Sequence, residues 1–158
     1  MFVSEKIATH RKWFLRKFEE FWKQKVENSS KLKHFYYTFK HGFETKKYLQ
    51  GRIDPFIRKT LATFRLGNHK LAAETLRYVT PQVPYEDRLC PFCKRKAESE
   101  AHFLQKCKAA IYTEARRDFT AKVTALVKNF DALSDDDKVF YLMTQENELA
   151  YKLLAEYT

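Results

Sequence analysis

Apolar residues recur along this chain every three or four positions, which is the spacing of helices that bury one face. Between Phe2 and Val26, one side of such a helix collects an aromatic-rich stripe, with Trp13 at its edge: Ile7, Phe14, Phe18, Phe21 and Trp22. The polar run of residues 28–30 then breaks the pattern. We therefore predict an N-terminal amphipathic helix within residues 1–30, whose stripe is buried in the chain's own core or in a dimer.

Residues 31–158 form the second predicted domain, and they continue the helical pattern. Ser30 can cap a helix over residues 31–43, and a short segment around Leu49 closes at Gly51. Asp54 followed by Pro55 predicts a helix start, and that helix should end near Gly67. Further helices are expected over residues 71–78, 109–127 and 148–157, and from Ser134 onward. Because the alternation typical of strands is nearly absent, the pattern predicts an all-α fold.

All three cysteines of the chain stand with one histidine in a C-x2-C-x8-H-x4-C pattern: Cys90, Cys93, His102 and Cys107. Zn²⁺ prefers four such ligands in a tetrahedron, and a closed Cys3His set is a structural site. Pro91 favours a tight turn between the first two ligands, and the segment SEAHFLQKC predicts a short helix that carries the other two. The pattern predicts a helical domain with an embedded structural zinc module over about residues 85–108.

Two other interpretations of the cysteines stay open. They can be buried without a ligand, because free cysteine behaves as a small apolar residue. Cys90 and Cys93 can also form a redox pair, although such pairs sit near a βαβ pattern that this chain lacks. An odd cysteine count without a signal peptide argues against a disulfide framework. We therefore expect an intracellular protein, in the nucleus or the cytoplasm.

The formal net charge of the 158 residues is +10, and it is unevenly distributed. Lys and Arg outnumber Asp and Glu by 12 to 5 in residues 1–50 and by 12 to 6 in residues 51–108, whereas residues 109–158 hold 6 against 9. The first two-thirds can thus neutralise phosphates. No apolar run approaches the ~18 residues of a membrane span, so no membrane partner is expected.

Seven cations are candidate nucleic-acid contacts: Lys31, Lys33, Lys40, Arg88, Lys94, Arg95 and Lys96. The last three project from the predicted zinc turn, and the first three alternate with aromatic residues, which suits a single strand. The alternatives are a solvated loop tip and a helix that buries its aromatics and solvates its lysines. Arg88 can reach either a phosphate or a carboxylate such as Glu74.

Three further polar residues precede the zinc turn. His69 can be a fifth ligand or a nucleic-acid contact, but we favour a structural role as a helix cap or in the core. Glu74 and Arg77 can pair with each other or brace the loop before Cys90. Signs of an enzyme are poor, because a Gly-rich phosphate loop, a nucleophile elbow and paired metal-binding carboxylates are all missing from the sequence. The acidic residues 135–137 fit a first helical turn without a metal.

The phrases FRLGNHKLAAETLRY, PYEDRLCPFC and ESEAHFLQKC resemble the C-terminal zinc-binding region that follows the reverse transcriptase in non-LTR retrotransposon polyproteins. KLKHFYYTFKHGFETKKYL and, more loosely, FYLMTQENELAYKLLAEY also match, so the resemblance covers about residues 31–158. Lys108 stands where such elements often have proline, and no polymerase carboxylate motif or endonuclease precedes the region. The resemblance implies an isolated or domesticated fragment rather than a working polymerase.

These observations together predict a non-enzymatic, zinc-stabilised domain that binds RNA or single-stranded DNA. The alternative is a protein–protein adaptor or a homodimerisation module that uses the aromatic N-terminal helix.

Overall fold

The computed structural model describes residues 2–29, 39, 45–51 and 53–158, and its elements confirm the all-α prediction. Among these residues the only β-type pairing is an isolated antiparallel bridge between Leu89 and Ala97. The chain divides into two compact units, Met1–Glu44 and Thr45–Thr158. The predicted helix over residues 31–43 lies almost wholly outside the described residues, so that helix and the boundary at residue 30 stay predictions.

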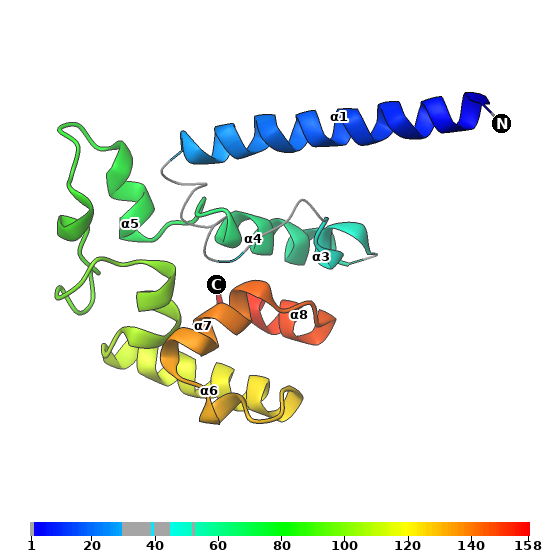
Figure 1. Ribbon diagram of the computed structural model, residues 1–158. Helices are drawn as coiled ribbons and strands as arrows, with labels where there is room; N and C mark the ends of the chain where they lie inside the picture. The colour runs from blue at the N-terminus through cyan, green and yellow to red at the C-terminus, as the bar shows by residue number, and fades with distance from the viewer. Residues whose placement is uncertain (1, 30–38, 40–44, 52) are drawn as a thin grey trace. The chain divides into compact units, whose positions relative to one another are not determined.

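The first unit contains the helix α1 (Phe2–Glu27), drawn in blue in Figure 1. The length of this helix agrees with the prediction. Most of its aromatic stripe, however, is exposed and not buried in the core of the chain. Phe14 is 65% exposed, and Ile7, Phe18 and Phe21 are exposed as well. Trp22 is half-buried and Val26 is buried. Most of the stripe is therefore exposed in the first unit, and its burial in a dimer, the second of the two predicted fates, stays a prediction.

The second unit is a bundle of helices with short helical turns between them. Its longer helices are α4 (Pro55–Arg65), α6 (Ala110–Leu126), α7 (Asp135–Thr144) and α8 (Glu148–Tyr157). The shorter elements are α3 (Lys47–Gln50), α5 (Ala72–Thr75), and the turns Leu76–Tyr78, Tyr85–Asp87, His102–Lys106 and Phe130–Ala132. Helix α8 packs against both α4 and α6, and Figure 1 shows it between them.

The helix starts in this unit follow the predicted capping signals. The Asp54 carboxylate accepts from the backbone N–H groups of Phe56 and Ile57, and Pro55 occupies the first helical position. The Ser134 hydroxyl accepts from the N–H of Asp137, so the acidic residues there form a first helical turn. Gly67 has φ 63°, the left-handed conformation that ends a helix.

Apolar side chains from all four long helices build the core of this unit. The buried residues include Leu61, Phe64, Phe119, Val123, Leu142, Met143, Tyr151 and Leu154. Leu104 and Cys107 extend the core to the turn His102–Lys106, which contacts α6 and α7. The second half of the cysteine motif is thus fixed by the bundle itself.

Candidate metal centre

A short hairpin over residues 88–98 positions the first two cysteines. The N–H of Cys90 donates to the carbonyl of Lys96 at 2.9 Å, and the N–H of Lys94 donates back to the carbonyl of Cys90 at 2.9 Å. Lys94 itself has φ 52°, so the chain reverses in a left-handed step directly after Cys93. The two-residue spacing therefore forms the predicted tight turn.

The turn η3 (His102–Lys106) positions the other two residues. It is a π-helical turn, and the N–H of Cys107 donates to the carbonyl of His102 at 2.8 Å, five residues back. Arg116 on α6 donates to the carbonyls of Phe103 and Cys107, both at 3.0 Å. The predicted short helix is confirmed, but it is wider than an α-turn, and Cys107, which follows it directly, is hydrogen-bonded back to its first residue, His102.

Cys90, Cys93, His102 and Cys107 come together as the sequence predicted, and their ligand atoms all lie within 4.8 Å of one another. Cys93 Sγ is 3.3 Å from His102 Nε2, and Cys90 Sγ is 3.9 Å from Cys107 Sγ. All three cysteines are free, so no disulfide competes with a ligand role. The cluster can hold a metal ion.

The surroundings shift the pKa values of three members of the cluster, and not all in the same direction. Burial raises the pKa of Cys90 to about 12, against the N–H groups of Cys93 and Phe92 that donate toward its sulfur. Burial also acts to raise the pKa of Cys93, but the N–H groups of Arg95 and Lys96 and the two other thiols lower it overall. Burial lowers the pKa of His102 and keeps its imidazole neutral, as a metal ligand must be.

Glu98 braces the hairpin, and the sequence analysis missed it. Its side chain is 3% exposed. One carboxylate oxygen accepts from the N–H of Ala72 at 2.7 Å and the other from the hydroxyl of Tyr112 at 2.8 Å. Glu98 thus ties the hairpin to α5 and α6. Nothing in the sequence distinguishes Glu98 from Glu100, because the two hydrogen-bond partners of Glu98, Ala72 and Tyr112, are distant in sequence.

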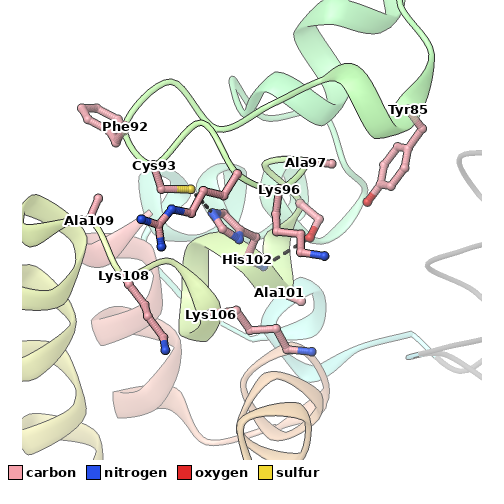
Figure 2. A pocket seen from close by; sticks show the side chains of 12 residues that line it. Tyr85, Phe92, Cys93, Lys96, Ala97, Ala101, His102, Lys106, Lys108 and Ala109 are labelled. Atoms are coloured by element: carbon pink, nitrogen blue, oxygen red, sulfur yellow. Dashed lines mark hydrogen bonds between the residues drawn. The ribbon is translucent and has the colours of Figure 1, made fainter.

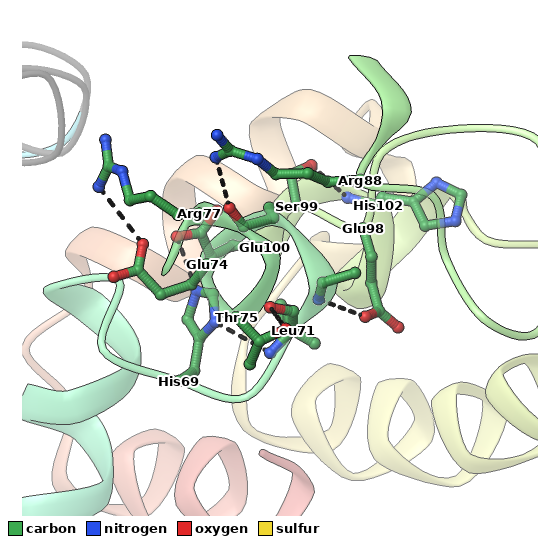
Figure 3. Close-up of polar contacts among 12 residues, drawn as sticks. His69, Leu71, Glu74, Thr75, Arg77, Arg88, Glu98, Ser99, Glu100 and His102 are labelled. Carbon is green, nitrogen blue, oxygen red and sulfur yellow. Dashed lines mark hydrogen bonds and ion pairs between the residues drawn. The ribbon is translucent and has the colours of Figure 1, made fainter. Parts of the chain in front are cut away.

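The residues before the hairpin have structural roles. His69 Nε2 is 2.9 Å from a carboxylate oxygen of Glu100, and its Nδ1 accepts from the N–H of Leu71, so the favoured core role is confirmed (Figure 3). Arg77 pairs with Glu74 at 3.4 Å, one of the two predicted arrangements. His69 is not part of the four-residue cluster.

The candidate nucleic-acid residues separate into three groups. Of the three cations of the hairpin tip, Arg95 and Lys96 line a groove beside the cysteine cluster, whereas Lys94 is exposed and does not line it; Lys106 and Lys108, which were not among the predicted contacts, line the same groove. Arg88 is buried, and its guanidinium donates to the carbonyls of Val83 and Ala73, so these contacts hold it inside the fold. Lys31, Lys33 and Lys40 lie outside the described residues.

Comparison with known protein families, curated proteins and solved structures found no match to this chain. The resemblance to retrotransposon C-terminal regions therefore stays a prediction from the motifs. In the described part of the chain, no helix is both long and apolar enough to cross a membrane.

Proposed function

We propose that the Cys3His cluster is a structural zinc site. With Zn–S bonds of about 2.3 Å and Zn–N bonds of about 2.0–2.1 Å, a tetrahedron has S···S edges of about 3.8 Å and S···N edges of about 3.5 Å. The 3.9 Å between Cys90 and Cys107 and the 3.3 Å between Cys93 and His102 fit these edges. Four protein ligands leave no open position for a reacting water, which supports a structural role.

We expect the purified protein to carry one Zn²⁺ per chain and Cys93→Ser to lose it. The variant should also melt at a lower temperature, because the binding free energy of a structural zinc, about 10–16 kcal/mol in zinc-finger peptides, is also folding free energy. Native mass spectrometry and a thermal melt measure both. Wild type treated with a chelator is the control and should match the variant; an unchanged melting temperature after metal removal would refute the proposal.

Acid should weaken this site. Cys90 holds its proton strongly without a metal, because burial raises its pKa to about 12. Binding must release that proton, so we expect zinc affinity to fall at least about tenfold per unit of decreasing pH. Competition with a chelator between pH 8 and pH 6 measures the slope.

We propose further that the chain is a non-enzymatic nucleic-acid-binding module for RNA or single-stranded DNA, descended from a retroelement C-terminal region. The observation that carries this proposal is the gathering of Arg95, Lys96, Lys106 and Lys108 along one groove beside the metal centre. A metal-braced hairpin fixes the first two of these cations. Fixed cations neutralise phosphates at a smaller entropic cost than flexible ones. Two sequence features support the same function: the resemblance of the zinc-binding motif to retrotransposon C-terminal regions, and the excess of Lys and Arg in the first two-thirds of the chain.

Neutralising the hairpin tip tests this function. Lys94→Gln, Arg95→Gln and Lys96→Gln together should weaken binding to single-stranded RNA and DNA and flatten the salt dependence, by about 0.7 in log–log slope for each phosphate that the variant no longer neutralises. Fluorescence anisotropy at several salt concentrations measures both. The zinc content of the variant verifies that the hairpin is intact. A wild type that binds no nucleic acid even at low salt would refute the function.

The exposed stripe of α1 favours a second function, as a protein–protein or homodimerisation module. Large apolar side chains are exposed along one face of this helix: Ile7, Phe14, Phe18 and Phe21. Contiguous exposed apolar faces mark interaction sites. Association through such a face would resist salt, whereas binding to phosphates would not.

A further inference from the structure

The groove beside the metal centre combines charge with open aromatic rings. It has a volume of about 770 Å³, and Cys93 and His102 form part of its wall. Besides the four cations, two aromatic residues line it: Phe92 and Tyr85. Figure 2 shows these two rings on opposite sides, with Lys96 and His102 between them. The groove therefore offers two separate apolar platforms with cations between and below them.

The groove keeps a net positive charge after the nearby negative groups are counted, and this charge suits an anion. Among the described residues, its lining includes no carboxylate. Three thiolates and one Zn²⁺ would add a charge of −1 to the wall, and Lys106 pairs with Asp136 on α7. Of the four cations about two thus remain uncompensated, which matches one or two phosphate groups.

Both rings are exposed but anchored. Phe92 is 52% exposed, and its ring contacts Tyr112 edge-on, with the ring centres 4.9 Å apart. Tyr85 is 53% exposed, and the Arg88 guanidinium lies over its ring at 5.9 Å. Arg88 is in turn held by two backbone carbonyls. A base can therefore stack on either ring without first ordering it, and this lowers the entropic cost of binding.

We propose that this groove takes a dinucleotide step of a single strand, with one base on Phe92, the other on Tyr85 and the linking phosphate on Lys96 and Arg95. The inference deepens the proposed nucleic-acid function and rests on it. A free phosphate would contact the cations but neither aromatic ring. A duplex would keep its bases paired and stacked on each other, so it could not offer them to two rings on opposite sides.

An oligonucleotide without bases separates stacking from charge. The zinc-loaded full chain should bind a ten-nucleotide oligothymidylate at least about 30-fold more tightly than an abasic strand of the same length, because two bases stack and each contributes about five-fold or more. The variant Phe92→Leu/Tyr85→Leu, which keeps apolar packing against Tyr112, should lose this preference. The control Phe56→Leu/Phe140→Leu removes two exposed rings on α4 and α7 and should keep it.

The cations are tested in the same assay. Arg95→Gln/Lys96→Gln removes both cations assigned to the linking phosphate, so it should weaken binding to both strands and reduce the salt slope by about 0.7 for each phosphate left without its cation. The control Lys122→Gln/Lys152→Gln removes the same charge from α6 and α8, where each lysine pairs with a carboxylate on its own helix, and should change little. If wild type binds both strands equally and the ring variant matches it, the groove inference fails while the nucleic-acid function stands. If wild type binds neither strand at low salt, both fail.

Discussion

At the scale of single residues, the hairpin that carries Cys90 and Cys93 is held by a carboxylate outside the four-residue cluster. Glu98 leaves the hairpin one residue after the bridge between Leu89 and Ala97, and its side chain reaches two other elements. A buried carboxylate is costly unless its oxygens are hydrogen-bonded, and here each of them accepts a bond. The hairpin is therefore fixed to the bundle at a point four residues before His102.

We expect Glu98→Ala to destabilise the protein by about 2–4 kcal/mol, because it leaves the N–H of Ala72 and the hydroxyl of Tyr112 without an acceptor. Glu98→Gln keeps one acceptor oxygen and the shape, so its cost should be at most about 1–2 kcal/mol. Urea unfolding of the zinc-loaded protein measures both. Glu86→Ala changes an exposed carboxylate in the same region and serves as the control. Equal stabilities for Glu98→Ala and the control would show that Glu98 braces nothing.

At the scale of elements, one arginine of α4 contacts three other helices of the second unit: α3, α7 and α8. Arg65, the last residue of α4, is 1% exposed. Its Nη2 donates to the carbonyls of Leu142 and Gln145 at 3.2 and 3.3 Å, which lie at the open C-terminal end of α7. Its guanidinium also lies over the rings of Tyr48 and Tyr151, 5.0 and 5.3 Å away. Arg65 therefore caps α7 and holds α8 through stacking.

Replacing Arg65 should show why the planar group is needed. Arg65→Lys keeps the charge but loses the fork and the stacking, so we expect a loss of about 1–3 kcal/mol. Arg65→Met fills the space but leaves both carbonyls unpaired, so a loss of similar size is expected. Arg117→Met on the exposed face of α6 is the control. An Arg65→Met variant as stable as wild type in urea would contradict this expectation. It would mean that burying the guanidinium charge costs as much free energy as its contacts contribute.

The elements also show what the sequence could and could not predict. Helix starts depend on neighbours in sequence, and so Asp54, Ser134 and the turn at Gly67 were predicted correctly. The metal cluster was predictable because its four residues fall within eighteen positions and suit one ion. Glu98, Arg65 and Arg116 bind partners that only the fold brings near, and no periodic pattern distinguishes them from exposed charges.

At the scale of the whole molecule, the two proposed functions use different units. The groove and the metal centre belong to residues 45–158, whereas the exposed stripe belongs to α1. Their responses to salt differ as well, because phosphate binding is electrostatic and the stripe is apolar. Variants in one unit can therefore test one function without disturbing the other.

We expect the protein to self-associate through α1. Burying the stripe removes large apolar side chains from water, at about 25 cal/mol per Å² of apolar surface, and two copies of one amphipathic helix supply matching faces. Phe14→Ser/Phe18→Ser should shift sedimentation-equilibrium data toward the monomer mass at both low and high salt. Leu149→Ser, which changes an exposed apolar residue on α8, should not. A wild type that stays monomeric at every concentration would refute self-association through this helix, and the stripe would then have to contact a different protein.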